Sequence, residues 1–327
     1  MNSIKTGNMK LYFLLVIALI ASVLFVLFFR YTPGWDFRNN LWAPAYLLSH
    51  QQSPYHIQVL FDNSTAIWLP MSIGLLFPLG LLPLQQAYNL WLLLNIVALF
   101  FIVYYSFHSG RKISVFLGII LLMILFRPTL GLLDLGQFSL IACFLFLVII
   151  QFDDKLHPFI IGVLLAVALT KPQLAMFFIP SYSILYAKEK GVKNLLLLWL
   201  YIGTGMLITS LPVWILHPAW LPDFIANLQQ NPDWMQPNLY ALFSQYLRNF
   251  QTPVMVIFFI SGMAINLLLP FWLPKKPALL WSLALTTIFS LYLWSWDFVL
   301  LYPLFIHFHH TAINFPELFF SLAGVSV

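Results

Sequence analysis

Long apolar stretches recur from one end of this chain to the other, and few charged residues lie between them. Apolar residues make up 61% of the 327-residue sequence, and Asp, Glu, Lys and Arg together make up only 8%. A soluble domain needs far more charge to cover its surface. Apolar runs of about 20 residues have the length that a helix needs to cross a bilayer. The sequence therefore predicts an all-α, polytopic integral membrane protein.

About ten transmembrane helices are expected. The apolar runs are 11–29, 87–107, 113–126, 136–151, 158–170, 173–187, 194–216, 253–273, 277–296 and 298–308. Several are only about 14 residues long, which is short for a full crossing of a ~30 Å core. Short, interrupted helices are tolerated where protein or water covers their backbone, so the pattern indicates a cavity entering the membrane from one side. We expect one transmembrane domain, 1–327, with two outer loops at 30–86 and 217–252.

The orientation of the chain depends on the stretch 66–84, which contains three prolines and two glycines. If this stretch folds back at the outer interface and the N-terminus is inside, ten of the 15 Lys and Arg residues lie inside, as the positive-inside rule requires. A crossing from the same start reverses that ratio. A crossing with the N-terminus outside restores it, but separates Asp36 from Asp134, Gln137 and Lys171. We favour the folded-back arrangement, with both ends of the chain inside.

Composition also excludes several kinds of site. Cys143 is the only cysteine, so the chain has neither a disulfide framework nor a thiolate metal site. The net charge of +5 comes from basic residues at the expected helix ends, where orientation signals belong, and does not indicate nucleic-acid binding. No glycine-rich phosphate loop is present, which argues against a nucleotide substrate. We expect no metal and no cofactor.

The first polar segment after an apolar run is 31–57, and it places Asp36 immediately outside the membrane. Residues 38–50 have the spacing of a short helix lying in the membrane interface. Its apolar stripe consists of Leu41, Ala45 and Leu48. Ser53-Pro54-Tyr55 then ends the helix. An acid in this position can meet a lipid headgroup, although it can equally well cap or turn the chain.

Further polar residues fall on the same side of the membrane in the favoured arrangement. They are Arg127, Asp134, Gln137, Lys171, Gln173 and Asp297. Ionisable residues at membrane depth are costly and usually mark a pathway or a site. Lys171 precedes a proline at a break between two short helices, where an ammonium suits a phosphate oxygen. The alternative is a lysine that only extends to the membrane surface.

The order of these motifs resembles glycosyltransferase family 87. The stretches WDFRNN, SPY, LDLGQFSL and LLAVALTKPQLAMFFIP follow one another as they do in that family. The matching residues are Asp36, Ser53-Pro54-Tyr55, Gly136-Gln137 and Lys171-Pro172. Members of the family are polyprenyl-phosphate-mannose-dependent alpha-mannosyltransferases with the GT-C fold. The resemblance thus implies a GT-C-like architecture with interfacial helices in the first outer loop.

The resemblance also implies a mechanism and its substrates. Asp36 would be the general base, and a hexose would move with inversion from a polyprenyl-phosphate donor to a lipid or glycan acceptor. The remaining residues would bind the donor phosphate or the substrates: Arg38, Tyr55, Arg127, Asp134, Gln137, Lys171, Gln173 and Asp297. The donor tail would lie beside the stripe at 41–48, among membrane lipids. The protein would be a multi-pass protein of the cell membrane with an extracytoplasmic active site.

Two other functions are compatible with the pattern. A transporter or flippase for lipid-linked sugars would also use a cavity with buried charges, and such proteins often contain internal repeats. No convincing repeat is present, and the polar residues gather at one face instead of along a path through the bilayer. A non-catalytic protein that binds polyprenyl lipids is the third alternative.

Overall fold

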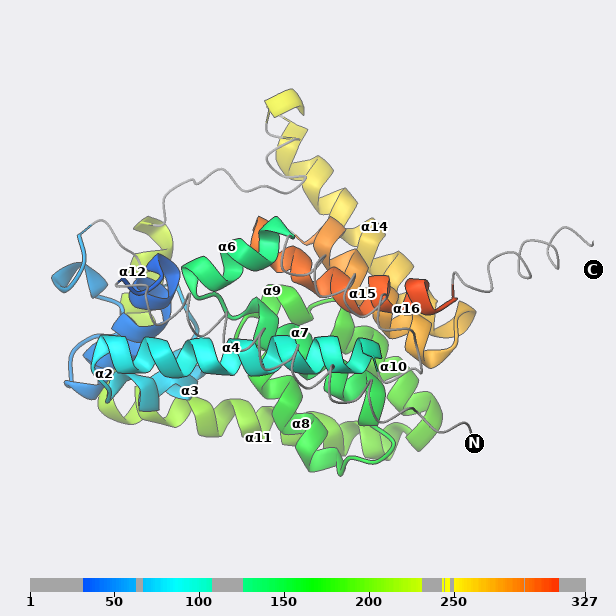
Figure 1. Cartoon of the computed structure of the whole chain (residues 1–327), viewed down its shortest axis with the longest axis horizontal. Coiled ribbons are helices and arrows are strands. Elements are labelled where there is room, and N and C mark those ends of the chain that lie inside the picture. The colour runs from blue at the N-terminus through cyan, green and yellow to red at the C-terminus, as the bar shows by residue number, and fades with distance from the viewer. Residues whose placement is uncertain are drawn as a thin grey trace, which may run out of the picture. The chain divides into compact units, whose positions relative to one another are not determined.

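The structure, a computed structural model, describes residues 32–62, 67–107, 126–230, 243, 245–247, 250–290 and 292–311 (Figure 1). Every regular element in these ranges is a helix, as the sequence predicts. The chain divides into two compact units. The first comprises Met1–Gln137 and Thr209–Asn231, and the second comprises Phe138–Ile208 and Pro232–Val327. Each unit is described by itself.

The first unit contains the segment around Asp36 and the helices that support it. Its elements are the π-helix η1 (Phe37–Trp42), α2 (Ala43–Ser49), the 3-10 helix η2 (Ile57–Val59), α3 (Pro70–Gly80), α4 (Leu84–Phe107), α6 (Arg127–Leu135) and α12 (Trp220–Gln230). Helices η1 and α2 follow one another without a break and confirm the helix expected at 38–50. The π-helical start was not predicted. Single π-turns are uncommon and occur often at functional sites.

The apolar stripe of this helix faces protein, so the expectation that it lies against lipid is wrong. Leu41, Ala45 and Leu48 are at most 2% exposed. They are buried because α2 packs along α3 (Figure 1). Gly80 makes the close approach possible, since a Cβ atom there would overlap the backbone of Ala45.

Helix α3 occupies the stretch whose crossing decides the orientation. It has 11 residues and begins at Pro70, whose fixed φ and missing N–H suit the first turn of a helix. At 1.5 Å per residue such a helix is about 16 Å long, roughly half of the hydrocarbon core. It is therefore too short to cross the membrane alone. Its location at the outer interface stays a prediction.

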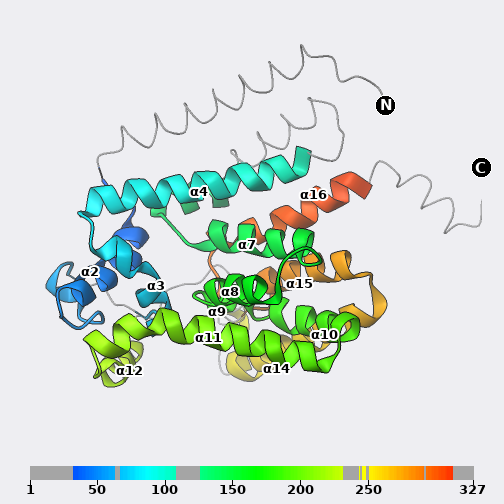
Figure 2. The ribbon, with the colours of Figure 1, turned by 90° about the horizontal axis from the view of Figure 1, so that it is seen from below.

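The second unit contains the remaining helices. They are α7 (Ser139–Phe152), α8 (Pro158–Ala168), α9 (Pro172–Ala175), α10 (Phe178–Lys190), most of α11 (Val192–Leu216), α14 (Gln251–Trp272), α15 (Lys275–Phe289), the 3-10 helix η4 (Ser295–Leu301) and α16 (Tyr302–Thr311). Helices α10, α14 and α15 contact one another and form its core (Figure 2). Prolines begin α8 and α9, which explains why the chain breaks where the sequence predicts.

Within the part of the chain that the structure describes, three helices are long and apolar enough to cross a membrane by themselves: Leu84–Ile102, Val192–Leu216 and Thr252–Trp272. The number rises to four if α6 and α7 are one broken span. The expected spans 11–29 and 113–126 lie outside the described residues. The total of about ten therefore stays a prediction, whereas the apolar, all-helical character of the described chain is confirmed.

One end of the second unit is fastened by a cluster of charges. The Lys275 Nζ, at the start of α15, lies 2.5 Å from Asp153 Oδ2 after α7 and 2.5 Å from Glu189 Oε2 in the last turn of α10. Three lysine-containing turns thus come together within this unit, and the favoured arrangement places all of their lysines inside: Lys155, Lys188, Lys190, Lys193, Lys275 and Lys276. Ser139, at the opposite end of the 14-residue helix α7, belongs to a different polar group.

Candidate functional site

Two glycines bring the segment of Asp36 against the end of α6. A Cβ atom at Gly34 would lie 2.5 Å from the Asp134 carbonyl oxygen, and one at Gly136 would lie 2.6 Å from Phe37 Cβ. Gly136 also has a φ of 74°, in the left-handed region that favours glycine. Its left-handed turn ends α6, with the amides of Gly136 and Gln137 both donating to the Leu132 carbonyl. Asp36 and Gln137 can meet because Gly34 and Gly136, which lie at the contact between their two segments, have no side chains.

Aromatic side chains of α4 hold this arrangement in place. The Trp91 Nε1–H donates to the Gly136 carbonyl at 2.8 Å. The Phe37 ring packs on Tyr88 and Trp91, with ring centres 5.4 and 5.8 Å away. Phe37 is fully buried, so it fixes the backbone next to Asp36 by packing on two rigid rings.

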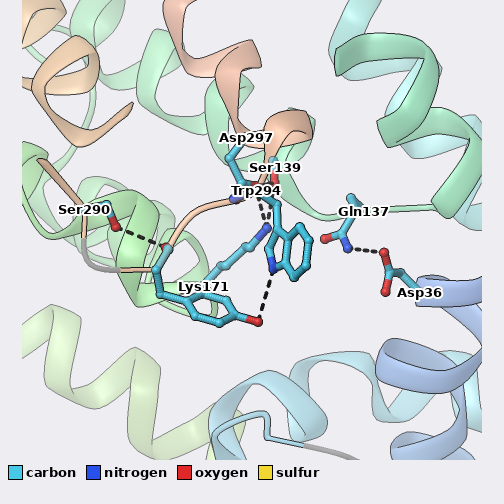
Figure 3. A network of polar contacts seen from close by, with 8 residues as sticks. Asp36, Gln137, Ser139, Lys171, Ser290, Trp294 and Asp297 are labelled. Carbon is cyan, nitrogen blue, oxygen red and sulfur yellow. Dashed lines mark hydrogen bonds and ion pairs between the residues drawn. The ribbon is translucent and has the colours of Figure 1, made fainter. Parts of the chain in front are cut away.

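Both carboxylate oxygens of Asp36 accept a hydrogen bond from a side-chain amide. Gln137 Nε2 donates to Oδ2 at 2.5 Å (Figure 3), and Asn40 Nδ2 donates to Oδ1 at 2.8 Å. Asp36 is 6% exposed and Gln137 is 7% exposed. A buried carboxylate is costly unless it is hydrogen-bonded, and these two amides supply that compensation. We name Asp36, Asn40 and Gln137 the carboxylate group.

A test of this support is the substitution Gly136→Ala. The new methyl group would overlap Phe37 and force alanine into a positive φ, which costs about 1–2 kcal/mol before the overlap is counted. The matched control is Gly131→Ala in the middle of α6, where a Cβ atom meets nothing within 4 Å and alanine favours the helix. In detergent we expect Gly136→Ala to lower the melting temperature and Gly131→Ala to leave it unchanged or raise it. Equal melting temperatures of the two variants would contradict this account of the turn.

A second polar group lies within the second unit. The Lys171 Nζ donates to Asp297 Oδ1 at 2.6 Å and to Ser139 Oγ at 2.9 Å, and the Ser139 hydroxyl also donates to Asp297 (Figure 3). Lys171 is 5% exposed, and the other two residues are fully buried. We name Lys171, Ser139 and Asp297 the ion-pair group. The sequence predicted the first and last of these residues as site residues, and the structure brings them together as partners.

The segment before Asp297 completes this group. Asp297 lies in the first turn of η4, and its Oδ2 accepts the backbone N–H of Trp294 at 3.0 Å. The Trp294 Nε1–H donates to the Tyr292 hydroxyl at 3.2 Å (Figure 3), and its ring stacks on Trp296 with centres 5.0 Å apart. Every polar atom of the Asp297 carboxylate is thus engaged by the protein, so Asp297 is the counter-ion of Lys171 in this structure.

The other predicted site residues lie on several different elements of the described chain. Arg127 is exposed at the first residue of α6, and Asp134 is exposed near its end. Both residues lie in one helix, α6, which begins at Arg127 and ends at Leu135. Gln173 is half-buried in α9. The guanidinium of Arg38 lies 4.4 Å from the centre of the Phe61 ring, and its Nε donates to Asn39 Oδ1 at 2.7 Å.

Tyr55 is fully buried and packs against α12. Its hydroxyl donates to the Trp68 carbonyl at 3.3 Å, and its own carbonyl accepts from Asn227 Nδ2 at 2.5 Å. Its ring centre is 5.7 Å from that of Phe224. Burial and, secondly, the charge of Asp223 raise the pKa of Tyr55, so the phenol stays protonated. Tyr55 therefore anchors the segment around the SPY motif on α12.

Sequence reasoning missed a third polar group, which lies next to Tyr55. Asp223 Oδ2 accepts from Ser53 Oγ at 2.5 Å and lies 2.8 Å from His217 Nε2 and 3.9 Å from His56 Nε2. Burial alone would raise the pKa of Asp223, but the hydrogen bonds of Ser53 and His217 and the attraction of the two imidazoles lower it overall. The carboxylate is therefore ionised at neutral pH. It ties Ser53 of the SPY motif to α12.

Among the described residues, one set of carboxylates has the spacing of a metal site. Asp153, Asp154 and Glu189 have ligand atoms within 4.8 Å of one another. The ammonium of Lys275 lies among them, 2.5 Å from two of the carboxylates and 3.6 Å from the third. Lys275 therefore takes the position of a cation, and this cluster does not fit a metal ion.

The fold and these buried polar groups define an integral membrane protein with the residues of an enzyme or a carrier. Comparison with known proteins decides between the two. The sequence model of Glycosyltransferase family 87 matches residues 69–303, which is more than two thirds of the chain. The chain belongs to glycosyltransferase family 87 and is a membrane glycosyltransferase. No curated protein and no solved structure matches it.

The matched range also separates the predicted site residues into two sets. Gln137 and the whole ion-pair group lie inside 69–303. Asp36, Arg38 and Tyr55 precede that range, so their roles depend on the motifs and on the structure alone. The contact between Asp36 and Gln137 joins the two sets within the first unit.

Proposed function

We propose that this glycosyltransferase moves a hexose, with mannose as the first candidate, from a polyprenyl-phosphate donor to a lipid or glycan acceptor. The transfer takes place on the extracytoplasmic face of the cell membrane and inverts the anomeric centre. A GT-C architecture is part of the proposal. The observation that carries it is the carboxylate group, which holds one acid, nearly buried, between two neutral amides in a chain that is 8% charged.

Asp36 acts as the general base in this proposal. The acceptor hydroxyl oxygen attacks the anomeric carbon and forms the new glycosidic bond, while its proton passes to a carboxylate oxygen of Asp36. The bond between the anomeric carbon and the phosphate oxygen breaks on the opposite face, and polyprenyl phosphate leaves with the electron pair. A general base must be ionised and lie within hydrogen-bond reach of the proton it takes. The amides of Asn40 and Gln137 favour the ionised form because both donate to it.

The leaving phosphate requires positive charge, and Lys171 is the first candidate for it. Its ammonium is nearly buried, where electrostatic interactions are stronger than in water. It is paired with Asp297 in this structure, so a phosphate would compete with that carboxylate. Arg38, in the same unit as Asp36, and Arg127 are the other candidates. We propose substrate contacts for Tyr55, Asp134, Gln137 and Gln173 as well, although the Tyr55 hydroxyl is already bonded to protein.

The sidedness of the proposal rests on charge and on the arrangement of the second unit. The turns that meet at Lys275 are those in which the sequence predicts inner, lysine-rich loops. The ion-pair group contains Ser139, at the opposite end of α7 from Asp153. A 14-residue helix separates these two ends by about 20 Å. This separation supports an inner end at Lys275 and an outer end at Lys171.

Sealed membrane vesicles of both orientations test the function and its sidedness together. Polyprenyl-phosphate-mannose is incorporated into both leaflets, and a panel of membrane-impermeant glycan acceptors is added outside the vesicles. We expect a mannosylated product in right-side-out vesicles and none in sealed inside-out vesicles until detergent is added. Polyprenyl-phosphate-glucose in place of the mannose donor shows which hexose is used.

The outcomes separate the alternatives. Movement of the lipid-linked sugar between leaflets with no glycosylated product would favour a flippase. Donor binding with neither product nor movement would favour a non-catalytic lipid-binding protein. Product only in inside-out vesicles would retain the transferase and overturn the extracytoplasmic site.

A further inference from the structure

We infer that Asn40 and Gln137 are positioning residues that act through Asp36, forming an amide clamp that sets its protonation and its orientation. The inference deepens the proposed function and rests on Asp36 being the base. It adds to Gln137 a role on the base, and it gives Asn40, the last residue of the WDFRNN stretch, a part in the reaction.

The geometry of the clamp fixes the plane of the carboxylate. Each oxygen of Asp36 receives one amide N–H, at 2.8 Å from Asn40 and 2.5 Å from Gln137. Two donors on two different oxygens prevent rotation about the terminal bond of the side chain, which is otherwise a broad torsion. The base is therefore pre-oriented before the substrate arrives.

The donors come from supports of different kinds. Asn40 lies four residues after Asp36, in a π-helix that starts directly at Phe37, so its position depends on local backbone. Gln137 is 101 residues away and arrives through the left-handed turn at Gly136, so its position depends on tertiary packing. The clamp therefore forms only when the first unit is folded.

The chemical nature of the two donors matters as much as their positions. Both are neutral amides, which stabilise the carboxylate without adding a positive charge. A Lys or Arg in either place would lower the pKa of the acid much further and weaken it as a base. An apolar residue would favour the neutral acid by desolvation. Two neutral amides thus hold the carboxylate without bringing a positive charge to it.

The variants Asn40→Leu and Asn40→Asp test the clamp, with Asn89→Leu as the control. Asn89 is also in the first unit, and its Oδ1 accepts from Gln85 in α4. For each protein the pH dependence of kcat/KM for transfer is measured from pH 4 to 9. On the acidic side of the profile, kcat/KM falls as the base becomes protonated. Loss of one amide donor should shift this fall to a higher pH by about one unit or more, since a hydrogen bond to a charged group is strong enough for that shift. The second carboxylate of Asn40→Asp should move it further, because like charges disfavour ionisation.

A purely structural role for Asn40 predicts a different result. Misfolding would lower the rate by the same factor at every pH and leave the acidic limb unmoved, and that result would overturn the clamp. If the Asn40→Leu rate returns to within about tenfold of the wild-type rate at pH values above the shifted acidic limb, the result supports the clamp. Asn89→Leu should keep the wild-type profile.

A second measurement decides the clamp even if the wild-type protein shows no transfer, in which case the proposed function fails by itself. The melting temperature is followed from pH 2.5 to 8 for Asn40→Leu, Asp36→Asn and the double variant. Hydrogen bonds that lower the folded-state pKa of a carboxylate stabilise the protein above the unfolded value of about 3.9 and stop doing so as pH falls through the folded value. We expect the loss from Asn40→Leu to be large at pH 7, smaller at pH 2.5, and smaller in the Asp36→Asn background. Additive, pH-independent losses would overturn the clamp.

Discussion

Replacing Asp36 by asparagine is expected to lower the rate of sugar transfer by at least about 100-fold, because a general base contributes at least that factor to the rate. Asparagine preserves the size of the side chain but cannot take a proton as a carboxylate does. It offers one oxygen where Asp36 offers two, so either Asn40 or Gln137 loses its acceptor. Loss of one buried hydrogen bond costs about 1–3 kcal/mol, which a folded protein can tolerate. Product formation and donor binding, measured side by side, should show that binding persists while transfer is lost.

The matched control for this experiment is Asp62→Asn. Asp62 lies in the same predicted outer loop, 30–86, and is exposed, so the substitution removes an equal charge without touching the carboxylate group. Its transfer rate should equal that of the wild type. Undiminished product from Asp36→Asn would remove Asp36 as the base and with it the proposed mechanism.

The ion-pair group should give the largest change in stability. Removing one partner of a buried ion pair leaves an uncompensated charge and typically costs about 3–5 kcal/mol. We therefore expect Asp297→Asn and Lys171→Met each to lower the melting temperature strongly. The double variant should regain most of the loss, because replacing both partners of a buried pair is often neutral. Thermal unfolding of the wild type, the two single variants and the double variant in one detergent completes this double-mutant cycle.

The same double variant separates packing from phosphate binding. If Lys171 contacts the leaving phosphate, the double variant is stable but uses the donor about 10- to 100-fold less well, since a charge-assisted contact contributes about 1.5–3 kcal/mol. Lys190→Met, which removes an exposed lysine at the end of α10, is the control and should change neither property. A stable double variant with wild-type transfer would make Lys171 a structural residue only.

Much of the fold could be predicted because local signals dominate in a membrane chain. The apolar runs and the prolines at positions 70, 158 and 172 mark where helices lie and begin, and the structure follows them. The family was recognisable from short motifs in a fixed order. The break at Lys171 and the site residue Asp297 were both identified from polar residues interrupting apolar sequence.

The pairing of side chains could not be predicted, because it is set by tertiary contacts. Ser139 looks like an ordinary helix-starting serine until Lys171 and Asp297 are seen on it. The stripe at 41–48 has the pattern of a lipid-facing surface. Only the structure shows that α3 covers it, at a close approach that Gly80 makes possible. Asn40 became part of the site through a π-helical turn, for which the sequence carries no recognised signal.

The long separations within the ion-pair group have a consequence for biosynthesis. Asp297 follows Lys171 by 126 residues. A ribosome adds roughly 5–20 residues per second, so the lysine is made on the order of 6–25 s before its counter-ion. During that interval an unpaired ammonium is costly in the hydrocarbon core. We therefore expect α8 and the short α9 that follows it to wait near water or within the insertion machinery, and to settle into the bilayer only after the last helices emerge.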